Sequence, residues 1–127
     1  MGRKTSKHLT NLELEVMQAL WAASPANVQM VQRGLKRELA YTTVQTVLNI
    51  LARKGHVSRQ LQDRTYFYSP VSSQRAAVRK TLRNFVDRVF GGSAERLVMN
   101  LIQTKALTPE QLAKLRKLLV QQRNKAD

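Results

Sequence analysis

The side chains best suited to specific contacts lie in one segment, residues 41–54. At 100° per residue, one face of a helix formed there carries short hydroxyl and amide groups and a terminal arginine. With two polar residues on its flanks, this face comprises Thr42, Thr43, Gln45, Thr46, Asn49 and Arg53. Groups of this size hydrogen-bond base edges in the major groove of DNA, and arginine suits phosphate. Because threonine is a poor helix former, the pattern favours groove contact over a merely solvated face.

A second group of contact residues surrounds a predicted β-hairpin. The alternating residues 57–61 and the β-forming run 65–68 flank a turn at Asp63–Arg64. Arg59 and Arg64 would stand on this wing, where arginine can touch the DNA backbone or minor groove. Plain solvent-facing charges remain the alternative. The three aromatic residues of the second strand could stack on single-stranded bases, but such a run more often places one face in the core.

The sequence offers little support for catalysis or metal binding. It contains no cysteine, which excludes disulfides, thiolate zinc sites and a cysteine nucleophile. His8 and His56 are far apart and lack neighbours at ligand spacing, so we expect surface or DNA-proximal side chains rather than metal ligands. There is no Gly-rich phosphate loop and no nucleophile paired with a base. We therefore expect no enzyme, no metal and no cofactor.

The charge balance indicates a polyanionic partner. The 127 residues include 22 Lys and Arg but only 8 Asp and Glu, for a net charge of +14. Neutralising phosphates releases condensed counterions, which stabilises binding, although charge alone does not distinguish DNA from RNA or an anionic membrane. No apolar run approaches the roughly 20 residues of a membrane span, and no signal peptide is recognisable. The expected location is the cytoplasm, without membrane insertion.

The elements that position these residues follow a familiar order. Apolar periodicity and capping residues predict three helices, at residues 11–23, from Asn27 to near Leu39, and at 41–54. Three helices followed by a hairpin make a winged helix-turn-helix, whose third helix enters the major groove. We expect a mainly α fold with a small β-hairpin wing. Residues 1–71 would form the DNA-binding domain and residues 72–127 a helical dimerisation domain.

The last 56 residues look entirely helical and would bury too little surface to be stable alone. Their apolar residues approach a coiled-coil spacing, so self-association would cover what a monomer leaves exposed. The residues expected at the dimer contact are Val78, Leu82, Phe85, Val89, Leu97, Leu101, Leu112, Leu115 and Leu119. Two-fold symmetry would then place two recognition helices on a palindromic operator, with half-sites about one helical turn apart.

Two segments are fairly specific in combination: Tyr-Thr-Thr-Val-Gln-Thr at residues 41–46 and Phe-Gly-Gly-Ser at 90–93. They are accompanied by residues 9–17 with Trp21, Lys54–Gly55, Tyr66 and Tyr68 with Pro70, and 107–110 with Leu112, Leu115 and Leu118. Together these segments resemble the BlaI/MecI penicillinase-repressor family of winged-helix regulators. The resemblance runs from about Leu9 to Leu119.

The resemblance implies a repressor of resistance or stress genes that binds double-stranded operator DNA as a homodimer. It also implies a membrane-bound sensor protease as partner, which triggers cleavage in the dimerisation helix; the matching bond here is Asn100–Leu101. A cut there would split the apolar stripe at residues 97–102 and weaken operator binding. A copper-sensing branch of the family uses C-terminal cysteines, which this chain lacks.

Two other kinds of protein fit the same features. A non-specific nucleoid or RNA-binding protein would use the basic charge without discriminating an operator from random DNA. An interaction module would bind protein through its winged helix, and its binding would depend only weakly on salt.

One position predicts a distinct operator. Members of the resembled family often carry Arg where this chain has Ile50, and helical geometry places position 50 on the exposed side near Thr46. An apolar side chain there can contact a thymine methyl group. We therefore expect Ile50→Arg to change the DNA sequence that the protein selects from a random pool. Identical selected sequences for the two proteins would contradict this prediction.

Overall fold

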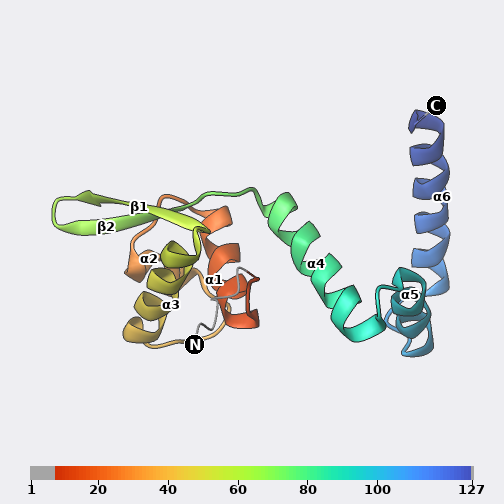
Figure 1. Ribbon diagram of the computed structural model, residues 1–127, viewed down its shortest axis with the longest axis horizontal. Helices are drawn as coiled ribbons and strands as arrows, with labels where there is room; N and C mark the ends of the chain where they lie inside the picture. Colours follow the sequence, from red (N-terminus) through yellow and green to blue (C-terminus); the bar gives the residue numbers. More distant parts are fainter. Residues whose placement is uncertain (1–7, 127) are drawn as a thin grey trace, which may run out of the picture. The chain divides into compact units, whose positions relative to one another are not determined.

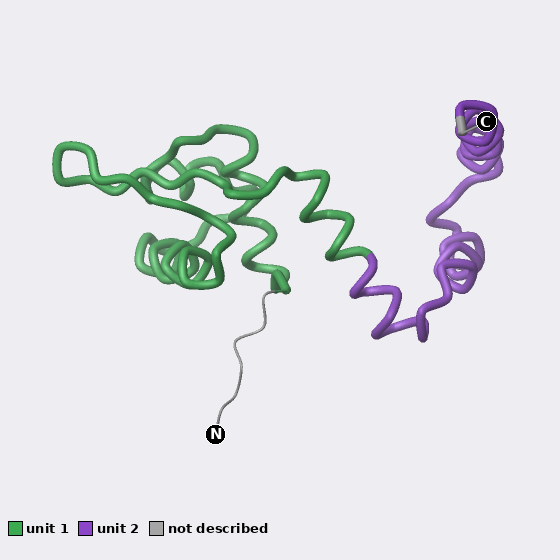
Figure 2. The backbone as a smooth tube through the Cα atoms, turned by 45° about the horizontal axis from the view of Figure 1, so that its top comes forward, with its two compact units in different colours: residues 1–82 green, residues 83–127 purple. Residues whose placement is uncertain are grey.

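The computed structural model describes residues 8–126. This part of the chain forms six helices and one two-stranded sheet (Figure 1). In order, the elements are α1 (Asn11–Ala22), α2 (Val28–Gly34), α3 (Tyr41–Lys54), β1 (Val57–Gln62), β2 (Thr65–Pro70), α4 (Gln74–Phe90), α5 (Ala94–Gln103) and α6 (Pro109–Ala126). The expected mainly α fold with a small hairpin is confirmed. Two compact units divide the chain between Leu82 and Arg83, within α4 (Figure 2); a domain boundary at residue 71 stays a prediction.

The core of the first unit is built by three short helices. Its largest fully buried side chains come from α1, α2 and α3: Val16, Met17, Leu20, Val31, Val44, Leu48 and Leu51. Local interactions set the starts of α1 and α2 and the end of α3. Thr10 and Glu13 form a reciprocal capping box at α1, the Asn27 side chain accepts from Met30 N at α2, and Gly55 ends α3 with φ of +84°.

The second helix is shorter than predicted. We expected it to continue to near Leu39, but α2 ends at Gly34, and Leu35 is extended with φ −78° and ψ 150°. Glycine is a poor helix residue, which weakens the helix at its last position. The Gln32 side chain then donates to the Leu39 carbonyl at 2.9 Å and ties the following segment back. Leu35 and Leu39 both pack against the core from this non-helical stretch.

The hairpin is attached to the helices by a backbone bridge. Strands β1 and β2 pair antiparallel with Arg59 opposite Tyr68, and the turn residues Asp63 and Arg64 have φ of 48° and 69°, as two-residue hairpin loops require. Tyr68 exchanges two backbone hydrogen bonds with Ala26, of 2.8 and 3.0 Å. This bridge fixes the base of the wing against the segment that precedes α2.

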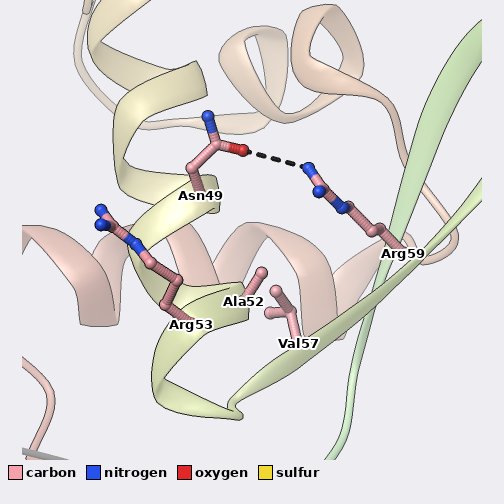
Figure 3. Close-up of a pocket in the computed structure, with 5 residues that line it drawn as sticks. All are labelled: Asn49, Ala52, Arg53, Val57 and Arg59. Atoms are coloured by element: carbon pink, nitrogen blue, oxygen red, sulfur yellow. Dashed lines mark hydrogen bonds between the residues drawn. The ribbon is translucent and has the colours of Figure 1, made fainter.

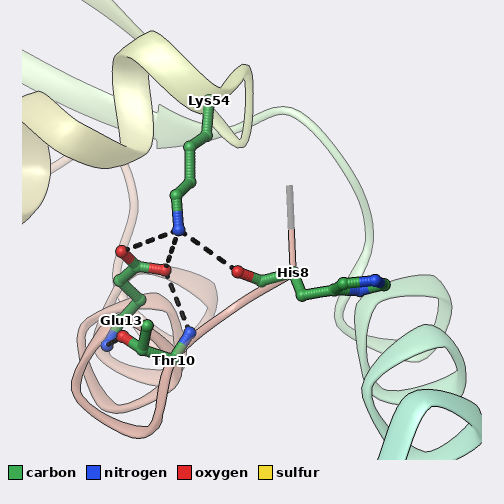
Figure 4. Close-up of polar contacts among 4 residues, drawn as sticks. All are labelled: His8, Thr10, Glu13 and Lys54. Carbon is green, nitrogen blue, oxygen red and sulfur yellow. Dashed lines mark hydrogen bonds and ion pairs between the residues drawn. The ribbon is translucent and has the colours of Figure 1, made fainter. Parts of the chain in front are cut away.

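A buried ion pair joins α1 to the end of α3. Lys54 Nζ lies 2.8 and 3.0 Å from the two carboxylate oxygens of Glu13 and donates to the His8 carbonyl at 3.2 Å (Figure 4). Both side chains are 7% exposed. The same Glu13 carboxylate accepts from Thr10 N at 3.0 Å. A charge removed from water must be met by several partners, and this geometry provides them.

The chain after the hairpin is helical, as expected. Ser73 caps the start of α4, Ser93 caps α5, and Thr108 forms reciprocal hydrogen bonds with Gln111 at the start of α6. Gly91 and Gly92 have positive φ between α4 and α5. Among residues 8–126 no helix is long and apolar enough to cross a membrane.

The ion pair generates a stability prediction. Lys54→Met removes the cation but leaves the Glu13 carboxylate buried without it, so we expect the free energy of unfolding to fall by about 3 kcal/mol. Arg37→Met is the matched control, because Arg37 pairs with Glu15 where the side chains are 57% and 35% exposed; its loss should stay below about 1 kcal/mol. Urea unfolding measures both. Equal losses for the two variants would contradict a structural role for the buried pair.

Candidate nucleic-acid interface

Helix α3 has one face in the core and one face in solvent. Val44, Val47, Leu48 and Leu51 are at most 5% exposed. Of the contact residues predicted from the sequence, Thr42, Gln45, Thr46 and Arg53 are exposed, and Thr43, Asn49 and Ile50 are half-buried. The helix therefore holds its short polar groups outward as a block, with Arg53 in its last turn.

The wing meets α3 at Asn49. Arg59 Nη1 of β1 donates to Asn49 Oδ1 at 3.4 Å, as Figure 3 shows, and the Tyr68 hydroxyl of β2 lies 3.5 Å from the same oxygen. The Arg59 guanidinium also lies 4.4 Å from the centre of the Tyr66 ring. The structure thus brings two residues that the sequence placed on separate contact elements into one cluster.

A hollow of about 530 Å³ lies beside this cluster, where α3 turns into β1. It is lined by Asn49, Ala52, Arg53, Val57 and Arg59 (Figure 3). Two arginines from different elements therefore border one concave surface. Such a surface suits an anionic group, since guanidinium groups bind phosphate oxygens through several donors at once.

Arg64 occupies a different place from Arg59. It stands in the two-residue turn at the tip of the hairpin and is exposed. The hairpin therefore has one arginine at its tip and one beside Asn49 of α3. Because the two arginines lie at different points along the hairpin, the hairpin can contact phosphates at more than one place on a nucleic-acid backbone.

The three aromatic residues of β2 differ in burial, and one of them enters the core, as the sequence predicted for this strand. Tyr68 is buried at 2% exposure, Phe67 is half-buried, and Tyr66 is 43% exposed beneath Arg59. The strand therefore contributes to the core through Tyr68 and supports an arginine through Tyr66.

In residues 8–126, no group of three His, Asp or Glu side chains could hold a metal ion.

Sequence reasoning missed three features that position this surface. Each of them joins different elements of the chain. They are the Glu13–Lys54 pair, the contact of Asn49 with Tyr68 and Arg59, and the hydrogen bond from Trp21 Nε1 to the Ser72 carbonyl at 3.0 Å. The capping-box role of Glu13 was readable from Thr10 three residues earlier. Nothing in the local pattern indicated that the same carboxylate faces Lys54.

Comparison with known proteins decides the family. The family model described as penicillinase repressor matches residues 9–121. The chain belongs to the penicillinase repressor family. The family resemblance seen in the sequence is thereby confirmed, and since the family consists of repressors, the expectation that the chain is no enzyme agrees with it.

Individual relatives of this penicillinase repressor family member match over nearly their full length. The penicillinase repressor of Bacillus licheniformis is 25% identical over 96% of this chain and 97% of its own. The transcriptional regulator BlaI of Mycobacterium tuberculosis is 34% identical over 77% of this chain and 86% of its own. The methicillin resistance regulatory protein MecI of Staphylococcus aureus is 24% identical over 94% of this chain and 98% of its own.

A solved structure supports the fold. MepR, a transcription regulator of the Staphylococcus aureus multidrug efflux pump MepA, has a TM-score of 0.52 and 17% sequence identity, and the match covers 94% of this chain and 81% of MepR. At this identity the similarity concerns the fold alone. The winged-helix architecture expected from the order of the elements is confirmed.

Proposed function

We propose that this protein is a transcriptional repressor that binds a palindromic operator as a homodimer, with α3 in the major groove and the wing on the DNA backbone. Bacterial operator DNA lies in the cytoplasm, where the protein would act. The observation that carries the proposal is the exposed polar face of α3 beside an arginine-bearing wing. In this arrangement Thr42, Gln45 and Thr46 would reach base edges, while Arg53, Arg59 and Arg64 would contact phosphate.

The proposed homodimer rests on the apolar surface of the C-terminal helices. α5 buries none of its residues, and α6 carries Leu115, Leu118 and Leu119 at 43%, 55% and 70% exposure. Of the residues predicted at the dimer contact, Val78, Leu82, Phe85, Val89, Leu101, Leu115 and Leu119 are exposed; Leu97 and Leu112 are half-buried. So many large apolar side chains exposed on these helices are unusual on a monomer and favour an interface. A second copy would supply the cover, because a palindrome requires two-fold symmetry.

The proposed operator can be selected from a random DNA pool and its affinity measured over a salt series. We expect a palindrome, bound by two chains at least a thousandfold more tightly than random DNA, with a steep loss of affinity as salt rises. Gel shift and sedimentation together report affinity and stoichiometry. Leu119→Asp puts a charge at the proposed dimer contact on α6 and leaves α3 unchanged. We expect this variant to be a monomer and therefore to bind the operator much more weakly. Binding without enrichment of any sequence would instead indicate the non-specific nucleoid or RNA-binding alternative.

We extend the proposal to the fate of the repressor. The relatives named for penicillinase and methicillin resistance support a resistance or stress operon as target. We also propose a membrane sensor protease as partner, as the family resemblance implies. Asn100 and Leu101 lie in α5 with both residues exposed, so local unwinding would make the bond between them accessible. We expect a fragment that ends at Asn100 in cells treated with a β-lactam, detected by mass spectrometry. An intact chain after the operon is induced would rule out this route.

A further inference from the structure

The Asn49 side chain of α3 has hydrogen bonds to both strands of the wing, from Arg59 of β1 and from Tyr68 of β2. We infer that Asn49 is a positioning residue, which holds Arg59 of the wing for a DNA phosphate, and that it does not read an adenine. This inference rests on the proposed DNA-binding function. It concerns how the two contact elements are joined.

The orientation of the Asn49 amide follows from its partner. An arginine guanidinium can only donate, so the atom that faces Arg59 Nη1 at 3.4 Å must be the amide oxygen. The buried Tyr68 hydroxyl, which needs a partner, lies 3.5 Å from the same oxygen. The Asn49 NH2 group is therefore not the atom that faces Arg59, and Figure 3 shows the amide oxygen on the Arg59 side.

This orientation restricts what Asn49 can recognise. Asparagine reads adenine through two bonds, in which its oxygen accepts from the adenine amino group and its NH2 donates to the ring nitrogen. The Asn49 oxygen already has two donors, so that bidentate pair is not available while Arg59 stays in place. The remaining NH2 can donate to any nearby acceptor, which gives little base discrimination.

The same contacts fix Arg59. The hydrogen bond from Arg59 to Asn49 is long at 3.4 Å, and the Tyr66 ring supplies a second support at 4.4 Å from the guanidinium carbon. In the strand register Arg59 is opposite Tyr68, and Tyr66 lies two residues from Tyr68 on the same strand face. The guanidinium thus rests between an amide and a ring, and its other donors remain available to phosphate. Holding it beforehand reduces the side-chain entropy lost on binding.

A double-mutant cycle tests the inference on the full chain. Asn49→Ala, Arg59→Ala and the double variant are titrated against the operator selected by the wild type and against random-sequence duplex, each over a salt series. We expect each single variant to bind both DNAs roughly tenfold more weakly and to lower the salt slope by about one. The double variant should bind no more weakly than Arg59→Ala, and the bases selected by Asn49→Ala should be those of the wild type.

Arg64 provides the matched control. It is an exposed wing arginine in the hairpin turn, whereas the wing residues that contact Asn49 are Arg59 and Tyr68. Asn49→Ala and Arg64→Ala should therefore weaken binding additively. An altered base preference at one A·T pair in Asn49→Ala, additive effects with Arg59→Ala, or an unchanged salt slope in Asn49→Ala would each overturn the inference.

Two measurements keep the test decisive. Thermal unfolding shows whether Asn49→Ala folds; should it not, Asn49→Asp keeps acceptor oxygens for Tyr68 and Arg59. In the N49D background Arg59→Ala should lower the unfolding midpoint by more than it does in the wild type, and an equal effect would overturn the contact.

If the wild type selects no operator, the proposed repressor function fails while the cycle on random duplex still decides the role of Asn49. Absence of binding to either DNA would refute both.

Discussion

The arrangement of the helices α1, α2 and α3 depends on two charges that are almost completely removed from water. Lys54 and Glu13 are both 7% exposed, and taking such groups out of water costs free energy that only close partners can offset. The three donors of the Lys54 ammonium meet both Glu13 oxygens and the His8 carbonyl. A shift of α3 along its axis or a rotation about it would break these bonds together. The pair therefore fixes the end of α3 relative to α1, and with it the direction of the exposed face of α3.

The wing is tied to the same frame by a different kind of bond. The backbone bridge between Ala26 and Tyr68 attaches β2 to the segment before α2, while the Tyr68 side chain enters the core. From this fixed point the Tyr68 hydroxyl and Arg59 both approach Asn49 on α3. The apolar core, the bridge and the Asn49 cluster thus hold helix and hairpin in one relation. A protein that must match both groove and backbone of DNA gains from such rigidity, since disorder in either element would be lost on binding.

The two parts of the chain manage apolar surface in opposite ways. The helices α1, α2 and α3 form a core whose main side chains are fully buried. By contrast, α5 buries no residue, and α6 leaves three leucines and one valine more than 40% exposed. Strong local signals start the later helices, including the reciprocal pair of Thr108 and Gln111 at α6. Local capping can specify a helix but cannot cover its apolar face. The apolar faces that α5 and α6 leave exposed are the surface that the proposed homodimer would cover.

The sequence by itself determined the features that arise from neighbours along the chain. It predicted α3 with both ends, the hairpin turn at Asp63–Arg64 and the exposed positions of Thr42, Gln45 and Thr46, because periodicity, capping and turn chemistry act over a few residues. It failed at the end of α2, where Gly34 and the tie from Gln32 to Leu39 stop a helix that its apolar spacing would continue. The Glu13–Lys54 pair and the support of Arg59 by Asn49 and Tyr66 were decided by the tertiary structure alone. These contacts join residues 41, 10 and 7 positions apart, and only the packing of α1, α3 and the hairpin brings their side chains within reach.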